Sequence, residues 1–169
     1  MRIRHASLLA WVYPSRMQPL TTSLEIHAPP ASVWAAMTDI EHCAGRIPAI
    51  KEIVMLTPGP VGLGTRWRET RLMFGRDATE TMEIYEWQPG VAYTAGATNC
   101  GCEYRATLRC KPHGQITILA SEFNAKPLTL FAKFMGAVMM PFMKNAMRKA
   151  LRGDLDAIKL HCESQQGAR

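Results

Sequence analysis

Apolar and polar positions divide the chain into a strand-like middle and a helical end. From residue 20 to residue 123, short runs rich in β-branched and aromatic residues alternate with turns that contain Gly and Pro. Because most of the connections are far shorter than a parallel crossover requires, successive strands are expected to pair antiparallel. The pattern predicts a meander-like sheet of seven strands, at residues 20–27, 50–56, 65–74, 79–87, 91–97, 103–111 and 115–123.

A short helix is expected directly after the first strand. Pro29 and Pro30 end that strand, and Val33, Trp34 and Met37 then fall at helical spacing on one apolar face. A second short helical or turn segment is expected to follow and to end at Pro48. These two segments are too small to form the core by themselves.

A long amphipathic helix is expected at the end of the chain. From Leu128 to Cys162, apolar residues recur at steps of three and four, while basic residues such as Lys144 and Arg148 lie mainly on the other side. Unbroken, this helix would be about 50 Å long at 1.5 Å per residue. Pro141 is expected to kink or divide it, because proline removes one backbone donor and crowds the preceding turn.

The length of 169 residues fits one domain, and the apolar fraction of 47% and charged fraction of 20% are typical of a globular protein. We expect an N-terminal extension at residues 1–17, a single ligand-binding domain at residues 18–164 and a flexible tail at residues 165–169. No run is long and apolar enough to span a bilayer, so no transmembrane segment is predicted. The chain is expected to be a monomer or a homodimer.

The net charge of +6 does not indicate a nucleic-acid-binding protein. Arg2, Arg4 and Arg16 lie in the predicted extension, and they account for half of the excess. The remaining surplus is too small for the electrostatic footprint that nucleic acid requires. No nucleic-acid partner is expected.

The five cysteines indicate a reducing compartment, and therefore the cytoplasm. Their number is odd and no CxxC pair is present, in a chain large enough to fold without disulfides. Cys100 and Cys102 would share one face of a strand and could be imagined as zinc ligands together with His42-Cys43 and His161-Cys162. Zinc sites usually show tighter ligand pairs, so we expect no metal site.

Motifs for nucleotide, acyl-enzyme and metal chemistry are absent. The chain has no Walker loop, no GxSxG elbow, no HExxH pair and no dinucleotide fingerprint, since Gly62 and Gly64 precede a strand rather than a helix. No cofactor is predicted.

Several short motifs, in this order and spacing, resemble the START-like superfamily, also called SRPBCC, and within it the polyketide cyclase/dehydrase group. The resemblance covers residues 20–163. Its motifs are Pro29-Pro30-x-x-Val33-Trp34, Ile47-Pro48, Gly62-x-Gly64-Thr65-x-Trp67, Glu86-Trp87-x-Pro89 and Asp154-Leu155-x-x-Ile158-Lys159.

The resemblance implies an α+β helix-grip fold, in which a curved seven-stranded antiparallel sheet wraps around the C-terminal helix and leaves a deep apolar cavity. Members of the group bind lipids, sterols, polyketides, plant hormones or quinones, and only some of them catalyse a reaction. The matching motifs are structural, so no catalytic set of the family transfers to this sequence.

Strand alternation suggests which side chains face the expected cavity. Trp67 and Met73 should point inward, and by the same alternation Glu69 and Arg71 would share that face. A buried pair would supply an acid or base and a carboxylate clamp, whereas a bulge would place it in solvent on the outer face. The predicted ligand-binding residues are Trp67, Met73, Met82, Ile84, Phe123, Phe131, Met135 and Met139.

Three hypotheses for the function follow. The first is a binding protein for a hydrophobic small molecule, such as a lipid, a quinone or a polyketide-like aromatic. The second is a cofactor-free cyclase or dehydratase, with Glu69, Arg71, Tyr93, Tyr104 and Glu122 as candidate catalytic residues. The third is a module that docks on a protein or membrane through the basic stripe Lys144, Arg148 and Arg152. The sequence alone does not decide between carrier and enzyme.

Overall fold

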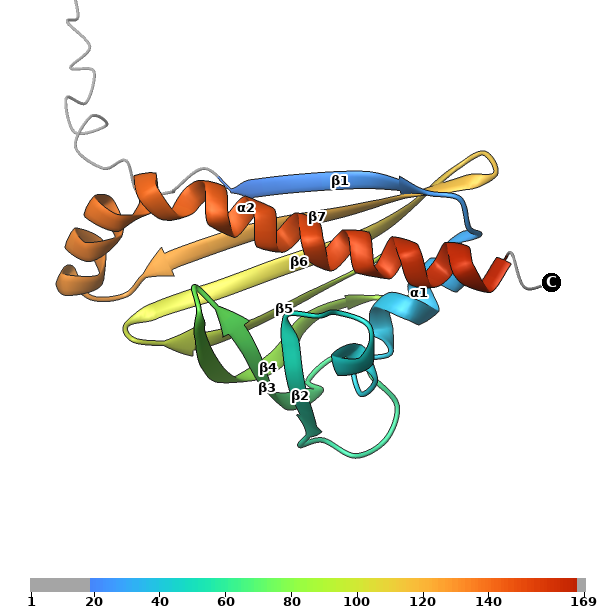
Figure 1. Ribbon diagram of the computed structural model, residues 1–169. Coiled ribbons are helices and arrows are strands. Elements are labelled where there is room, and N and C mark those ends of the chain that lie inside the picture. The colour runs from blue at the N-terminus through green and yellow to red at the C-terminus, as the bar shows by residue number, and fades with distance from the viewer. Residues whose placement is uncertain (1–18, 167–169) are drawn as a thin grey trace, which may run out of the picture.

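One layer of antiparallel sheet and one long helix make up most of the molecule (Figure 1). The computed structural model describes residues 19–166. The sheet has seven strands in the order β1-β7-β6-β5-β4-β3-β2, which confirms the predicted helix-grip fold. The strands are β1 (Leu20–Ile26), β2 (Ile50–Met55), β3 (Arg66–Met73), β4 (Arg76–Gln88), β5 (Ala92–Asn99), β6 (Cys102–His113) and β7 (Ile116–Pro127).

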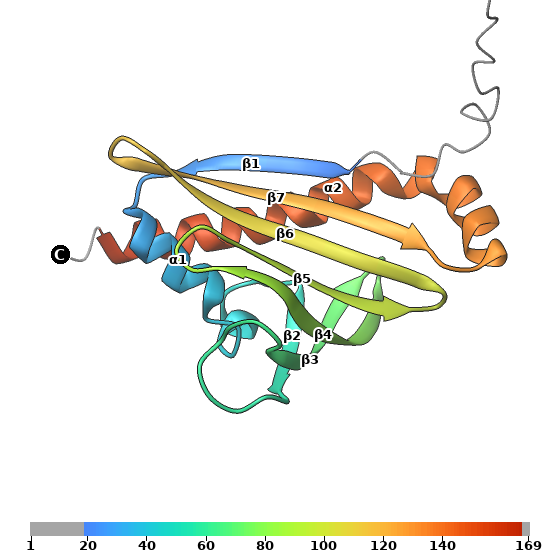
Figure 2. The same cartoon turned by 180° about the vertical axis from the view of Figure 1, so that it is seen from behind.

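Helix α2 (Leu130–Gln166) crosses one face of the sheet, which we call the inner face. Seen from behind in Figure 2, the other face carries no helix in the described part of the chain. The predicted extension at residues 1–17 lies outside the described residues, and α2 continues two residues into the predicted tail. Neither described α-helix is long and apolar enough to cross a membrane.

Two tight hairpins hold the middle strands in register. Phe74 and Gly75 connect β3 to β4, and Cys100 and Gly101 connect β5 to β6, all four with positive φ angles. Such pairs form the two-residue turns whose twist matches that of the strands. The break predicted between residues 74 and 79 was therefore too long, because Arg76 already pairs with β3.

Helix α1 (Pro30–Thr38) and the short 3-10 helix η2 (Cys43–Gly45) lie between β1 and β2. Pro30 occupies the first helical position, where the missing N–H of proline costs no hydrogen bond. Val33 and Met37 are buried, as the predicted apolar face requires. These segments cover one end of the sheet (Figure 1).

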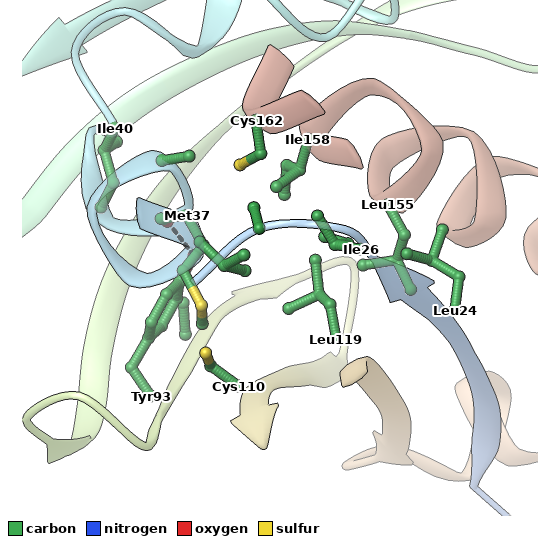
Figure 3. Packing of buried hydrophobic residues seen from close by; sticks show 14 of the residues in the cluster. Leu24, Ile26, Met37, Ile40, Tyr93, Cys110, Leu119, Leu155, Ile158 and Cys162 are labelled. Atoms are coloured by element: carbon green, nitrogen blue, oxygen red, sulfur yellow. Dashed lines mark hydrogen bonds between the residues drawn. The ribbon is translucent and has the colours of Figure 1, made fainter. Parts of the chain in front are cut away.

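The hydrophobic core lies where the C-terminal part of α2 meets β1, β7 and α1 (Figure 3). Leu155, Ile158 and Cys162 of α2 pack toward Ile26 and Leu119, and all five side chains are buried. The first turns of α2 run in a different direction from the rest of the helix (Figure 1). The helix is nevertheless continuous through Pro141, so the proline does not divide it.

Candidate ligand-binding site

Strand β3 presents its charged side chains on alternate faces. Trp67 is buried against the core, and Glu69 and Arg71 are only partly accessible on the same face. Arg66 and Arg68 are exposed on the opposite face. No bulge interrupts the pairing of β3 with β4, so the inward alternative for Glu69 and Arg71 is the one that the structure shows.

Three charged side chains meet beneath α2 and form what we call the acid–arginine cluster: Glu69, Arg71 and Asp154. One Nη of Arg71 donates a hydrogen bond to Oδ2 of Asp154 over 2.8 Å, and Nε of Arg71 lies 3.1 Å from Oε1 of Glu69. The indole Nε1 of Trp67 donates to Oε2 of Glu69 over 3.2 Å. The cluster therefore links two strand positions of β3 to the long helix.

The cluster holds two carboxylates against one guanidinium. Burial raises the pKa of Glu69, and the charge of Arg71 and the hydrogen bond from Trp67 only partly oppose this effect. Burial likewise raises the pKa of Asp154, against the attraction of Arg71. Nε of Arg71 is buried and makes no hydrogen bond among the described residues. A carboxyl group in such surroundings can hold or release a proton closer to neutral pH than an exposed one.

The inner face next to the cluster is mostly apolar. A pocket of about 20 Å³, lined by Glu69, Arg71, Met73, Ala78, Glu80 and Met82, has room for about one water molecule. Further along the face, the ring of Tyr104 stacks on Phe123 with centroids 6.2 Å apart, and both side chains are half-buried. Partial burial raises the pKa of Tyr104 to about 12, so its phenol remains protonated at neutral pH.

The predicted ligand-binding residues occupy three different environments. Trp67 and Ile84 are buried and form the wall of the core. Met73, Met82 and Phe123 are half-buried on the accessible part of the inner face. Phe131 and Met139 are exposed on the first half of α2, and the side chain of Met135 lies outside the described part of the structure.

The remaining catalytic candidates do not converge on the cluster. The hydroxyl of Tyr93 donates to the backbone oxygen of Met37 over 3.0 Å and is buried. Burial raises the pKa of Tyr93 far above its usual range. Glu122 is exposed and accepts a hydrogen bond from Nδ2 of Asn124 over 3.1 Å. The structure therefore brings together Glu69 and Arg71 but not Tyr93, Tyr104 and Glu122.

A second and larger hollow, which we call the α1 cleft, opens between α1 and the loop that joins β2 to β3. Its volume is about 640 Å³, and Trp34, Met55 and Trp87 form its apolar wall. The rings of Trp34 and Trp87 lie 5.0 Å apart. The other lining residues are Ala35, Thr38, Asp39, Ile40, Glu41, Thr57, Pro58, Gly59, Pro60 and Val61.

Ion pairs fix the acidic side of the α1 cleft. Oδ2 of Asp39 lies 2.6 Å from Nη1 of Arg46, and Oδ1 lies 2.7 Å from Nδ1 of His42. Although burial alone would raise it, these hydrogen bonds hold the pKa of Asp39 below its ordinary value. The Asp39 hydrogen bond raises the pKa of the exposed His42. Both carboxylate oxygens of Asp39 are therefore engaged by neighbouring side chains and are not available as a catalytic acid or base.

Sequence reasoning missed Asp154 and the α1 cleft. Asp154 lies 83 residues from Arg71 along the chain, and only its place in the motif Asp154-Leu155 singled it out. Within residues 19–166, no group of three or more His, Cys, Asp and Glu side chains is placed to hold a metal ion.

A curved seven-stranded antiparallel sheet with a long C-terminal helix across it is the helix-grip fold of START-like proteins. The chain matches the family described as "Polyketide cyclase / dehydrase and lipid transport" over residues 17–163, and it belongs to that family. This confirms the resemblance seen in the sequence. No curated protein sequence gives a significant match to this chain.

Solved structures share the fold at low sequence identity. TTHA0849 from Thermus thermophilus superposes with a TM-score of 0.73 at 17% identity, covering 88% of this chain and 99% of that one. The di-domain ARO/CYC BexL from the BE-7585A biosynthetic pathway gives 0.74 at 20% identity, covering 89% and 51%. A START superfamily protein from Mycobacterium smegmatis gives 0.69 at 14%, covering 87% and 98%.

Proposed function

We propose that this chain binds a hydrophobic small molecule on the inner face of its sheet, beside the acid–arginine cluster. The observation that carries the proposal is a largely buried charged cluster surrounded by half-buried apolar side chains. Met73, Met82 and Phe123 supply apolar surface, and Glu69 and Arg71 supply polar groups. Ligand sites typically combine an apolar wall with a few such groups.

The same residues indicate the chemical class of the ligand. The accessible inner face suits an extended or aromatic apolar body, such as a lipid, a quinone or a polyketide-like aromatic. An oxygen of that ligand would lie against the guanidinium of Arg71 and the carboxyl group of Glu69, which are 3.1 Å apart on this face. The pocket of about 20 Å³ is too small for such a molecule, so the ligand must lie over the half-buried residues.

A cofactor-free cyclase or dehydratase is the second candidate, and the position of Glu69 favours it. A buried carboxyl group with a raised pKa can accept and return a proton, and Arg71 beside it can stabilise a developing enolate. Once a turnover is known, Glu69→Gln should abolish most of it. Unchanged turnover in this variant would eliminate the enzymatic candidate.

We also propose a cytoplasmic location. All five cysteines are unpaired in the described structure, and Cys110 and Cys162 are buried as thiols. Free thiols at this frequency suit a reducing compartment. A C-terminal fluorescent fusion seen outside the cytoplasm would contradict this location.

Native mass spectrometry of the purified protein tests the binding proposal, followed by solvent extraction and identification of any small molecule. We expect the protein to carry a hydrophobic passenger, or to take one up from a panel of fatty acids, quinones and polycyclic aromatics. A protein that is empty and takes up none of these compounds would contradict the proposal.

A further inference from the structure

The first turns of α2 carry apolar side chains that nothing in the described structure covers. Phe131 and Phe134 are 73% and 68% exposed, although large aromatic side chains are usually buried. We call this set the apolar patch, and it comprises Leu128, Leu130, Phe131, Phe134, Val138 and Met139. All of the patch except Leu128, which precedes the helix, lies in the first turns of α2, and these turns run in a different direction from the rest of the helix (Figure 1).

The patch forms one side of an ordered helix rather than a frayed end. The hydroxyl of Thr129 accepts a hydrogen bond from the backbone N–H of Ala132 over 3.1 Å and so caps the helix. Leu130, Phe134 and Val138 follow at intervals of four residues, which aligns them along one face. Ala132 is buried, so another side of the helix packs against the rest of the protein.

The stretch of chain that carries the patch is basic. Between Glu122 and Asp154 the sequence contains no acidic residue. The basic residues of this stretch that are exposed and form no ion pair in the described structure are Lys126, Lys133, Lys144, Arg148 and Lys149. Arg152 differs from them, because it pairs with Asp156 over 3.1 Å.

We call the five unpaired basic residues of this stretch the basic border. We propose that the apolar patch and the basic border dock this protein on the surface of an anionic lipid bilayer. A helix with exposed aromatic and aliphatic side chains beside unpaired lysine and arginine matches both layers of such a surface, the acyl boundary and the charged headgroups. A second copy of the chain fits poorly, because two patches brought face to face would also bring two basic borders together. The proposal is independent of the ligand proposed above.

Vesicle co-sedimentation of the full chain tests the proposal. We expect binding to vesicles of phosphatidylcholine and phosphatidylglycerol, weak binding to phosphatidylcholine alone, and loss of most binding in about 0.5 M salt. Because both variants remove contacts with the bilayer, Phe131→Ser/Phe134→Ser and Lys144→Glu/Arg148→Glu should each lower the partition coefficient about tenfold or more.

Leu160→Ser is the matched control, because Leu160 is 72% exposed on the same helix but outside the patch. Its binding should stay within about twofold of the wild type. Thermal unfolding of each variant checks that the fold is intact.

Two results would overturn the proposal. The first is no binding to the anionic vesicles, and the second is binding that Leu160→Ser weakens as much as the patch variant does. If vesicle binding is absent and sedimentation velocity shows a dimer that Phe131→Ser/Phe134→Ser dissociates, the patch belongs to a second copy. Passenger binding in native mass spectrometry is read separately, so either proposal can fail alone.

Discussion

Glu69 is held by neighbours that act on its acidity in opposite directions. Burial favours the neutral carboxyl group, whereas Arg71 at 3.1 Å and the indole of Trp67 at 3.2 Å favour the carboxylate. Burial has the larger effect, so the pKa of Glu69 is raised. The folded protein therefore binds a proton at Glu69 at a higher pH than the unfolded chain does.

This difference predicts a pH dependence that Glu69→Gln removes. The pKa of Glu69 in the folded protein lies above the ordinary value of 4.5. The contribution of Glu69 to the free energy of unfolding therefore rises as the pH falls through the folded pKa toward 4.5. From about pH 7 to about pH 5, the unfolding free energy of the wild type should therefore increase relative to that of the variant. Urea unfolding at both pH values measures the change.

His42 and Asp39 titrate in the wild type and in Glu69→Gln alike, so their effects on stability cancel in the difference between the two proteins. A difference between wild type and variant that stays constant with pH would contradict the raised pKa. A change of the opposite sign, with the wild type losing stability relative to the variant as the pH falls, would show that Arg71 dominates over burial.

Strand alternation predicted that Glu69 and Arg71 share one face, because side chains in a strand repeat every two residues, but it left open whether that face is the inner one. Strand alternation could not predict Asp154, the third member of the cluster. Asp154 meets Arg71 only because the final third of the chain folds back across the sheet. The orientation of Tyr93 toward Met37 was equally hidden, since it depends on how α1 packs.

Helix α2 has two parts, one packed in the core and one exposed. The C-terminal part buries Leu155, Ile158 and Cys162 in the core. The N-terminal part exposes Phe131 and Phe134. The helical period predicted a helix at residues 128–162, close to the observed Leu130–Gln166, but a periodic pattern reports which residues share a face and not whether that face is covered. The exposed patch therefore could not be foreseen.

Two glycines predict opposite responses to alanine. Gly153 lies within α2, where an added Cβ would meet nothing within 4 Å, so Gly153→Ala should stabilise the protein by about 0.5–1 kcal/mol. At Gly96 the same atom would lie 2.0 Å from the backbone oxygen of Tyr104. Gly96→Ala should therefore destabilise the protein by about 1–3 kcal/mol. Urea unfolding of both variants measures these changes.

The two variants act as controls for each other, since each adds the same methyl group. Destabilisation by Gly153→Ala would mean that the helix is strained at that turn. A neutral Gly96→Ala would contradict the close approach of β5 and β6.

Strand positions were predicted well and strand ends less well. The run predicted at residues 79–87 is longer in the structure, where β4 spans Arg76–Gln88. The reason is the two-residue turn, which needs positive φ at Phe74 as well as at Gly75. Phenylalanine is an unusual residue for that conformation, so residue preferences alone do not place the turn there.

Two separate hollows in the molecule are candidate sites for a ligand. The inner face carries the acid–arginine cluster but only a small enclosed pocket, of about 20 Å³. The α1 cleft is larger, about 640 Å³, and is lined by Trp34, Trp87 and several loop residues. The fold class was predictable from turn spacing and motif order. The α1 cleft was not, because it depends on the path of the loop between β2 and β3.

The measurement that separates the two hollows is a titration with the fluorescent hydrophobic probe anilinonaphthalene sulfonate. Met82 lines the inner-face pocket and Met55 lines the α1 cleft, and both are half-buried methionines, so their alanine variants are matched. We expect Met82→Ala to weaken probe binding about threefold or more and Met55→Ala to leave it unchanged. Weakening by Met55→Ala alone would place the ligand in the α1 cleft and contradict the inner-face site.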